Sequence, residues 1–232
     1  MIEIILIHLY VIAGIVAALI PLFILYRFWF FFRSPGRKIP EGDVIVAPAD
    51  GRINYVRRIW SGEVPLSVKK GVPIILPELM DDPGGGYDIV IGIFMTPFSV
   101  HHNRIPMSGV VKKTAYRTAP SGKNMPRAYL NLLFDLRPFA EGCEYILKNE
   151  RNTTVIEGDG VRGAVVQIAD KWIRRIVTRL KEGDRVKKGE IFGMIRMGSQ
   201  CDLFLKIGRD FEITVMENQR VKAGSSVLVR LL

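Results

Sequence analysis

Cysteine and histidine are scarce in this 232-residue chain, and their scarcity narrows its possible chemistry. It has two cysteines, Cys143 and Cys201, without CxxC spacing, and three histidines without an HExxH motif. This pattern excludes a cysteine-rich zinc site and gives no disulfide framework, so we expect no bound metal and a reducing compartment. Interleaved aromatic and basic residues of the kind that bind single-stranded nucleic acid are also lacking, so we expect no nucleic-acid partner.

Charged side chains are nearly absent close to the N-terminus. From Ile4 to Tyr26 the only ionisable groups are His8 and two tyrosines. The run is long enough for a membrane-spanning helix, which needs about 20 apolar residues. It lacks the basic leader and small-residue cleavage site of a secretory signal peptide. Residues 1–33 are therefore predicted to anchor the chain in a membrane, by spanning it or, given Pro21 and the aromatic run 28–32, by lying in its interface.

The charges on either side of this segment predict its orientation. Four basic residues lie at its end and beyond it, and one acidic residue precedes it: Arg27, Arg33, Arg37 and Lys38, against Glu3. The positive-inside rule then places residues 34–232 on the cytoplasmic side of a cell membrane. The formal net charge of +10 favours an anionic partner, such as an acidic membrane surface or a phosphate-bearing substrate.

Short apolar runs separated by turn residues dominate residues 34–232. The runs expected as strands are 44–46, 51–56, 72–76, 88–95, 153–157, 163–168 and 211–215. Pro73 cannot donate to a ladder and favours a sheet edge. The segments 126–136 and 168–180 suit a helix or a strand equally.

The predicted fold is mainly β with a few helices (α+β). The stretches 47–53 and 182–195 place glycines and turn residues around strands, and are similar to parts of barrel-sandwich carrier domains. We therefore expect a barrel-sandwich-like β domain preceded by an N-terminal membrane helix. The chain offers no convincing lysine at a hairpin tip for a carrier group, so the similarity concerns fold alone.

Three residue types that together activate a hydroxyl nucleophile occur at separate places. They are Asp50, the pair His101 and His102, and Ser199, which follows Gly198 in a stretch that otherwise alternates like a strand. Adjacent residues of an extended chain point to opposite sides, so one histidine can face a site while the other faces away. Each residue also has a plainer interpretation: a turn aspartate, loop histidines and a serine beside a β-bulge.

Five motifs in consistent order resemble the phosphatidylserine decarboxylase proenzyme family, in the short branch that includes archaetidylserine decarboxylases. The resemblance covers about residues 30–205. The motifs are residues 47–51, 100–106, 148–152, 166–176 and 192–199.

The resemblance implies a proenzyme that cuts its own chain between Gly198 and Ser199. The Ser199 hydroxyl would attack the Gly198 carbonyl, and elimination and hydrolysis would convert Ser199 into a covalent pyruvoyl cofactor. Glycine suits this position because it has no side chain to block the attack. The products would be a β chain, residues 1–198, and an α chain, residues 199–232. They would form a heterodimer that the family suggests dimerises further.

The resemblance also implies the reaction, in which the pyruvoyl carbonyl accepts the electrons released as CO₂ leaves. A membrane phospholipid with a serine head group, phosphatidylserine or archaetidylserine, would be converted to the ethanolamine phospholipid. Asp50 would orient or polarise a histidine, and His101 best matches the family's site histidine. Longer relatives carry a second histidine where this chain has Arg104, so the roles of His101, His102 and Arg104 stay open. Contacts with the substrate are expected from Arg104, His102, Asn149 and Arg151.

Two other functions would use the same features differently. A membrane-tethered, non-catalytic adaptor would explain the fold and the anchor but not the Gly198-Ser199 pair. A membrane serine hydrolase would keep Ser199 as a hydroxyl. The chemical state of residue 199 therefore separates the decarboxylase from both alternatives, whereas the type of lipid tail is not encoded in these motifs.

Overall fold

The computed structural model describes most of the chain. The described residues are 1–61, 63–69, 72–75, 79–119, 125, 130, 134, 144–170, 176–196 and 199–232. They belong to two compact units, Met1–Pro35 and Gly36–Leu232, which we describe one at a time.

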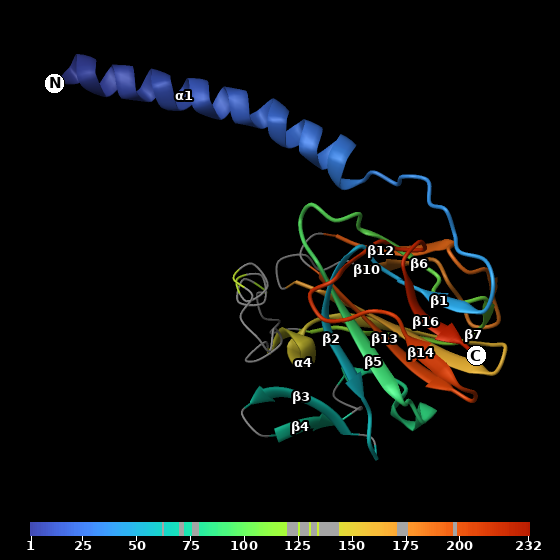
Figure 1. Ribbon diagram of the computed structural model, residues 1–232. Helices are drawn as coiled ribbons and strands as arrows, with labels where there is room; N and C mark the ends of the chain where they lie inside the picture. Colours follow the sequence, from blue (N-terminus) through green and yellow to red (C-terminus); the bar gives the residue numbers. More distant parts are fainter. Residues whose placement is uncertain are drawn as a thin grey trace. The chain divides into compact units, whose positions relative to one another are not determined.

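The first unit is one apolar helix (Figure 1). It consists of α1 (Ile2–Leu25), which continues into a π-helical turn, η1 (Tyr26–Phe31). No side chain of α1 is buried within the protein. At about 1.5 Å per residue its 24 residues extend roughly 36 Å, more than the ~30 Å hydrocarbon core of a bilayer. The helix is thus long and apolar enough to cross a membrane, and the predicted N-terminal helix is confirmed.

The second unit is built mainly of strands (Figure 1). They are β1 (Val44–Val46), β2 (Gly51–Arg58), β3 (Glu63–Lys69), β4 (Val72–Ile75), β5 (Ile89–Met95), β6 (His102–Arg104), β7 (Gly109–Arg117), β8 (Arg151–Gly158), β9 (Val161–Ala169), β10 (Ile176–Thr178), β11 (Arg185–Val186), β12 (Ile191–Ile195), β13 (Ser199–Ile207), β14 (Phe211–Ile213), β15 (Arg220–Val221) and β16 (Val227–Leu231). Its described helices are the short η2 (Pro83–Gly85) and α4 (Tyr145–Lys148).

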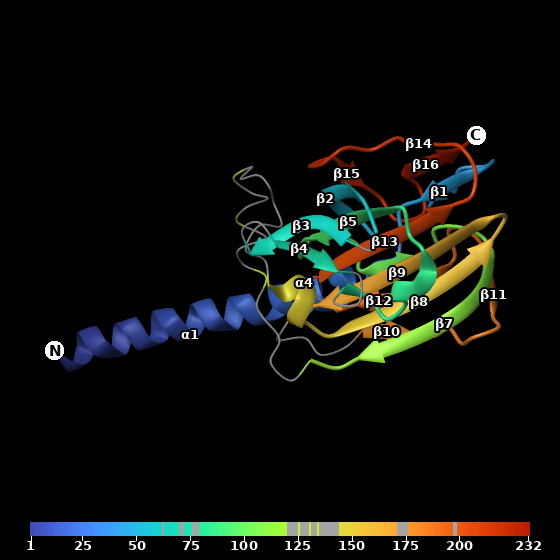
Figure 2. The ribbon, with the colours of Figure 1, turned by 90° about the horizontal axis from the view of Figure 1, so that it is seen from below.

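An eight-stranded antiparallel sheet is the framework of this unit. Its order is β11-β7-β8-β9-β13-β5-β2-β15, and it curls into a half-barrel (Figure 2). Two three-stranded sheets, β1-β16-β14 and β10-β12-β6, and the hairpin β3-β4 complete the described strands. The prediction of a mainly β domain behind an N-terminal helix is therefore confirmed.

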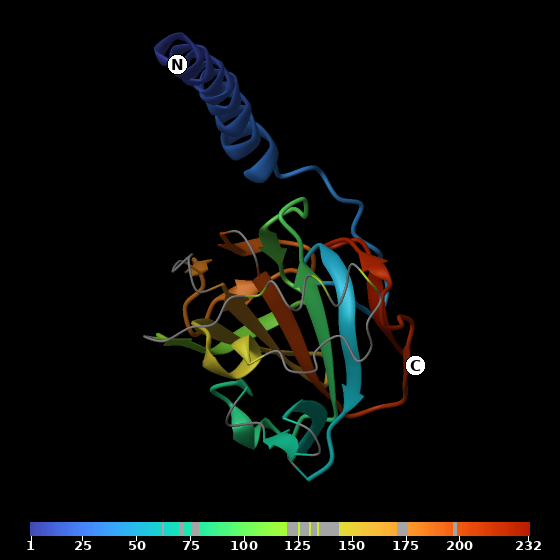
Figure 3. The same ribbon diagram turned by 90° about the vertical axis from the view of Figure 1, so that its left-hand side faces the viewer.

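Strand β13 occupies the interior of the large sheet. It pairs with β5 on one side and β9 on the other, and Figure 3 shows it (red) beside β5 (green). Both of its faces are buried as well. Leu203 and Leu205 pack into one apolar cluster, whereas Phe204 packs into a second cluster on the opposite face. Because residues 199–205 are all buried, any polar side chain among them needs partners inside the protein.

The strands expected from the sequence are found, with small differences at their ends. The run 88–95 begins as a strand at Ile89, and the run 211–215 ends as a strand at Ile213. Pro73 lies in β4 of the two-stranded hairpin, where every strand is an edge.

The two ambiguous segments are only partly described. In 126–136 only Leu130 and Phe134 are described, so the choice between helix and strand falls outside the described residues. In 168–180 the described part includes the strand β10, and residues 171–175 fall outside.

Candidate active site

The three candidate residues for a nucleophilic site are brought to one end of the large sheet. Ser199 opens β13 opposite Met95, the last residue of β5, and Ala169, the last residue of β9. Asp50 directly precedes β2, whose first residues pair with the same end of β5. The chain leaves β5 through a tight turn and then reaches His101.

The hydroxyl of Ser199 is fully buried beside a chain of amide side chains. Its Oγ donates to Sδ of Met95 at 3.2 Å, and Nδ2 of Asn103 lies 4.0 Å from the same sulfur. Nε2 of Gln167 donates to Oδ1 of Asn103 at 2.9 Å, and Nδ2 of Asn152 donates to Oε1 of Gln167 at 3.2 Å. The serine thus lies at the end of a buried polar row, whose hydrogen bonds join residues far apart in the sequence.

His101 is held next to the chain segment that leads to Ser199. The backbone N–H of Ile195, at the end of β12, donates to the carbonyl of His101 at 3.2 Å. Gly198, the other partner of the expected cleavage, lies outside the described residues. His101 is buried and His102 is partly exposed, as expected for adjacent residues of an extended chain that point to opposite sides.

Asp50 is bound by an arginine and a backbone amide. Nη2 of Arg37 donates to both carboxylate oxygens, at 3.0 and 2.7 Å, and the N–H of Ala223 donates to Oδ1 at 2.7 Å. Burial lowers the pKa of Arg104, the charge of Arg37 lowers it further, and Asp50 opposes both. The structure therefore groups Asp50 with two arginines, and within the described residues its hydrogen bonds do not go to a histidine.

Arg104 and His102 share the partly exposed face of β6. Nη1 of Arg104 donates to the carbonyl of Gly189 at 2.8 Å, and its backbone N–H donates to the carbonyl of Pro48 at 2.9 Å. These contacts fix the arginine against the loop that carries the aspartate. Arg104 and His102 are thus the two expected substrate contacts that keep some exposure.

The other two expected substrate contacts, Asn149 and Arg151, are buried. Nδ2 of Asn149 donates to the carbonyl of Ala169, the β9 neighbour of the serine, at 2.7 Å. The guanidinium of Arg151 donates to the carbonyls of Leu79 at 2.8 Å, Asn149 at 3.3 Å and Leu147. Burial lowers the pKa of Arg151 to about 10. Asn149 therefore supports the backbone at the site, and Arg151 holds backbone carbonyls together.

A second buried network lies on the opposite face of β13, centred on Gln200. Its Oε1 accepts from Nδ2 of Asn54 at 3.1 Å and from the hydroxyl of Tyr145 at 2.5 Å. Its Nε2 donates to the hydroxyl of Tyr55 at 2.9 Å and to Oδ1 of Asp202 at 2.8 Å. The Tyr55 hydroxyl in turn donates to Oδ2 of Asp202 at 2.7 Å. Two polar residues at alternate positions of an apolar strand were the signal that could have revealed this network.

Asp202 should make the stability of the protein depend on pH. Burial raises its pKa to about 6, while the hydrogen bonds from Tyr55 and Gln200 and the charge of Arg151 act in the opposite direction. A raised pKa means that the folded state binds this proton more tightly than the unfolded state, whose pKa is about 3.9. As the pH falls from about 6 to about 4, this group should therefore add about 3 kcal/mol to the free energy of unfolding.

Asp202→Asn tests this contribution. Urea unfolding between pH 4 and pH 7 should show that the wild type gains stability relative to the variant as the pH falls. Comparing the two chains removes the effect of other groups such as Asp82, whose pKa is lowered by Arg162 and Tyr87 although burial opposes them. Parallel stability curves for the two chains would rule out a titrating Asp202.

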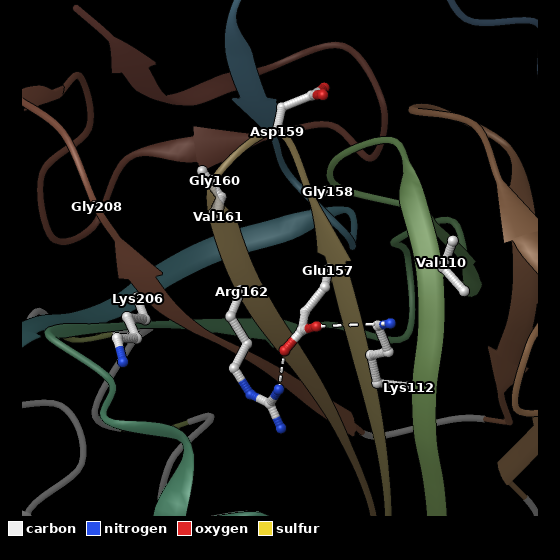
Figure 4. Close-up of a pocket in the computed structure, with 10 residues that line it drawn as sticks. All are labelled: Val110, Lys112, Glu157, Gly158, Asp159, Gly160, Val161, Arg162, Lys206 and Gly208. Carbon is white, nitrogen blue, oxygen red and sulfur yellow. Dashed lines mark hydrogen bonds and ion pairs between the residues drawn. The ribbon is translucent and has the colours of Figure 1, made fainter.

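A shallow hollow of about 400 Å³ lies at the other end of the sheet. Figure 4 shows Arg162 and Lys112 on either side of Glu157, and Lys206 also lines the hollow. Arg162 pairs with Glu157 and also with Asp82, at 2.7 Å, and Lys112 lies 3.8 Å from Glu157. Lys206 is seven residues beyond the serine on β13, roughly 23 Å at about 3.3 Å per residue. This hollow is therefore separate from the candidate site.

The surroundings of Ser199 suit a cofactor made from that residue. The amide of Asn103 offers a buried hydrogen-bond donor on the same side of the sheet, near the sulfur that the hydroxyl contacts. A carbonyl at position 199 would thus have a polar neighbour. In the described part of the chain, no cluster of three or more His, Cys, Asp and Glu side chains is arranged to hold a metal ion.

Comparison with known proteins identifies relatives along almost the whole chain. A profile of the phosphatidylserine decarboxylase family matches residues 24–229. A phosphatidylserine decarboxylase proenzyme from Solibacter usitatus is 35% identical over 214 residues, which are 92% of this chain and 81% of the relative. A protein from Methanocaldococcus jannaschii, provisionally named an archaetidylserine decarboxylase proenzyme, is 35% identical over 86% of this chain and 87% of the relative.

A third relative gives the same result. The phosphatidylserine decarboxylase proenzyme of Xanthobacter autotrophicus is 37% identical over 87% of this chain and 72% of the relative. The match extends from the end of the apolar helix through the strands that carry the candidate site. The chain belongs to the phosphatidylserine decarboxylase family of carboxy-lyases, and the three relatives compared above are named as proenzymes.

Proposed function

We propose that this protein is a membrane-anchored proenzyme that cuts itself between Gly198 and Ser199 and then decarboxylates a serine-headed phospholipid. Phosphatidylserine or archaetidylserine would be converted to the corresponding ethanolamine phospholipid and CO₂. The observation that carries the proposal is the environment of Ser199. Its buried hydroxyl opens an interior strand beside a row of buried amides, and the preceding strand is hydrogen-bonded to His101.

Self-cleavage needs a nucleophile, a base and a leaving group. Oγ of Ser199 would attack the carbonyl of Gly198, and the amide would rearrange to an ester. His101 is the proposed base, because it is the buried histidine at this end of the sheet. Loss of the α-proton of residue 199 would then expel the Gly198 carboxylate, and water would release ammonia to leave the pyruvoyl group. Ser199 is thus consumed in making the cofactor.

The pyruvoyl carbonyl, once formed, supplies an acceptor for the electron pair released as CO₂ leaves. The other tasks fall to side chains of this protein. His101 is the proposed donor of the proton that replaces the carboxylate, a contribution of typically 10²–10⁴-fold. Asp50 accepts hydrogen bonds from Arg37, and its negative charge favours the protonated form of Arg104. Its proposed role is therefore to hold these two cations in position.

The substrate's carboxylate and phosphate are both anions, and the partly exposed face of β6 offers cationic partners. Arg104 presents a planar fork that matches either anion, and His102 lies on the same face. Asn149 is proposed to act close to the substrate by holding the carbonyl of Ala169. Arg151 donates its hydrogen bonds to backbone carbonyls. Its proposed role is therefore to hold the backbone around the site, and not to bind the substrate directly.

A vesicle assay tests the proposed reaction. Purified protein is mixed with vesicles of phosphatidylserine, and in parallel with archaetidylserine, each labelled at the serine carboxyl. We expect labelled CO₂ and ethanolamine phospholipid in equal amounts from at least one lipid. Lack of turnover of both lipids by a chain shown to be cleaved would overturn the proposed substrate class. An uncleaved chain whose serine reacts with a fluorophosphonate would instead indicate a hydrolase.

The anchor is proposed to keep the enzyme at the membrane that holds its substrate, with the catalytic unit on the cytoplasmic side. Removing residues 1–35 leaves the compact unit Gly36–Leu232. We expect this truncated protein to cleave itself but to shift from the membrane fraction to the soluble fraction, measured by fractionation and blotting. The full-length chain is the control. A truncated protein that still sediments with membranes would show that the second unit carries the main membrane contact.

A further inference from the structure

Cleavage would turn the start of an interior strand into a chain end. Ser199 would become the first residue of the α chain, while both neighbouring strands, β5 and β9, belong to the β chain. New chain ends tend to fray because nothing holds them on the outer side. The catalytic group would nevertheless sit on that first residue, so its position needs a support other than the bond that was cut.

We propose that Gln200 is this support, through a clamp of four side chains that binds the second residue of the α chain. The clamp consists of Asn54, Tyr55 and Tyr145 from the β chain and Asp202 from the α chain. The inference rests on the proposed self-cleavage. It makes Gln200 a positioning residue for decarboxylation, one that is dispensable for the cut itself.

The amide of Gln200 is fully used by the clamp. A primary amide can accept two hydrogen bonds and donate two. Oε1 accepts from Asn54 and Tyr145, and Nε2 donates to Tyr55 and Asp202. All five side chains are buried, so water cannot replace these bonds. Three of the four bonds cross from the α chain to the β chain.

Two residues of β5, Gly92 and Phe94, allow the side chains of Tyr55 and Tyr145 to reach Gln200. On β5, Gly92 pairs with both Tyr55 and Asp202, and a Cβ at Gly92 would come within 2.5 Å of the Tyr55 ring. The missing side chain therefore gives the ring room to cross β5 and meet Asp202. The ring of Tyr145 packs against Phe94, with centroids 6.5 Å apart, and Phe94 is the β5 partner of Gln200. These contacts hold both tyrosine rings against β5, a strand of the β chain.

The clamp and the reacting group would occupy opposite faces of one strand. Gln200 points to the clamp, whereas Ser199 points to Met95 and the amide row. Fixing residue 200 therefore fixes the backbone that carries residue 199 without placing a polar group against the substrate. Misplacement of a reacting group by about 1 Å can lower a rate by about 100-fold.

Gln200→Met tests the proposal, since methionine has a similar length but cannot form the four bonds. The full-length protein should still be cut into two chains, as measured by intact mass. Hydrogen exchange at the amides of residues 200–202 in the cut protein should accelerate by about 100-fold or more, because four hydrogen bonds are lost. With phosphatidylserine vesicles, kcat should fall by about 100-fold while KM changes little.

Phe204→Leu is the matched control. Phe204 is buried on the same face of β13 in the apolar cluster that includes Tyr55 and Tyr145, so its truncation loosens the core without removing a hydrogen bond of the clamp. We expect a loss of Tm similar to that of Gln200→Met, but neither faster exchange at residues 200–202 nor a lower kcat. Equal kcat and equal exchange in Gln200→Met and wild type would overturn the proposal. A folded Gln200→Met chain that is not cut would also overturn it, because the network would then serve the cleavage step.

Tyr145→Phe keeps the proposal testable if Gln200→Met does not fold. It removes one hydroxyl and one bond to Oε1, and exchange at residues 200–202 should rise by about fivefold. Unchanged exchange would contradict the clamp. Failure of the proposed function looks different, since the wild-type chain itself would then stay uncut and no α chain would exist.

Discussion

A chain carrying Ser199→Ala is expected to remain one uncut polypeptide of 232 residues and to release no CO₂ from phosphatidylserine vesicles. The methyl group of alanine cannot attack the preceding carbonyl, and no cofactor can be made from it. Decarboxylation should fall by at least about 10⁶-fold, the low end of enzymatic rate enhancements. Intact mass and labelled CO₂ measure the two effects on the same preparation.

Cys201→Ala is the control for this substitution. Cys201 is buried on the same strand and the same face, two residues beyond Ser199, and packs in the apolar cluster. Its loss should lower stability by a few kcal/mol at most, while cleavage and turnover persist. Cleavage between residues 198 and 199 in the Ser199→Ala chain would show that another nucleophile acts, and the proposed maturation would be wrong.

His101→Ala is expected to slow self-cleavage by about 10²–10⁴-fold, since the nucleophile would lose its proposed base. The rate is measured by following the two fragments after synthesis in a cell-free system. Any enzyme that matures should also show a lower kcat, because the same imidazole is proposed to return the proton. Circular dichroism and Tm would separate this effect from unfolding, since His101 is fully buried.

The adjacent histidine provides the comparison. His102 is partly exposed on the other side of the chain, next to Arg104 on β6. His102→Ala should change the cleavage rate by less than about tenfold and act mainly on KM, in keeping with a role in substrate binding. If His102→Ala blocks cleavage and His101→Ala does not, the roles of the two histidines are the reverse of those proposed.

Most of the fold could be predicted because local sequence determines it. Alternating or continuous apolar runs bounded by glycine, proline and asparagine are sufficient to indicate strands such as Ile89–Met95 and Arg151–Gly158. The apolar helix is equally local, since Ile2–Leu25 has almost no charged residue. The order of the eight strands could not be predicted, because pairs such as β13 with β5 join residues about a hundred positions apart.

The candidate site was predictable in its residue types and less so in its contacts. The alternation of His101 and His102 follows from extended geometry alone. The bond from the N–H of Ala223 to Asp50 joins residues 173 positions apart and leaves no local trace in the sequence. A substrate contact was expected of Arg151 because it lies in the family motif 148–152, whereas the fold buries its side chain against backbone carbonyls.

Intact mass spectrometry of the purified full-length chain, before and after borohydride reduction, is the most direct test of the proposed maturation. The account predicts two chains, residues 1–198 and residues 199–232. Reduction should add the mass of two hydrogen atoms to the smaller chain, because borohydride converts a pyruvoyl carbonyl to a hydroxyl. A single uncut chain from membranes that actively decarboxylate the lipid, or a smaller chain that still begins with an unmodified serine, would contradict it.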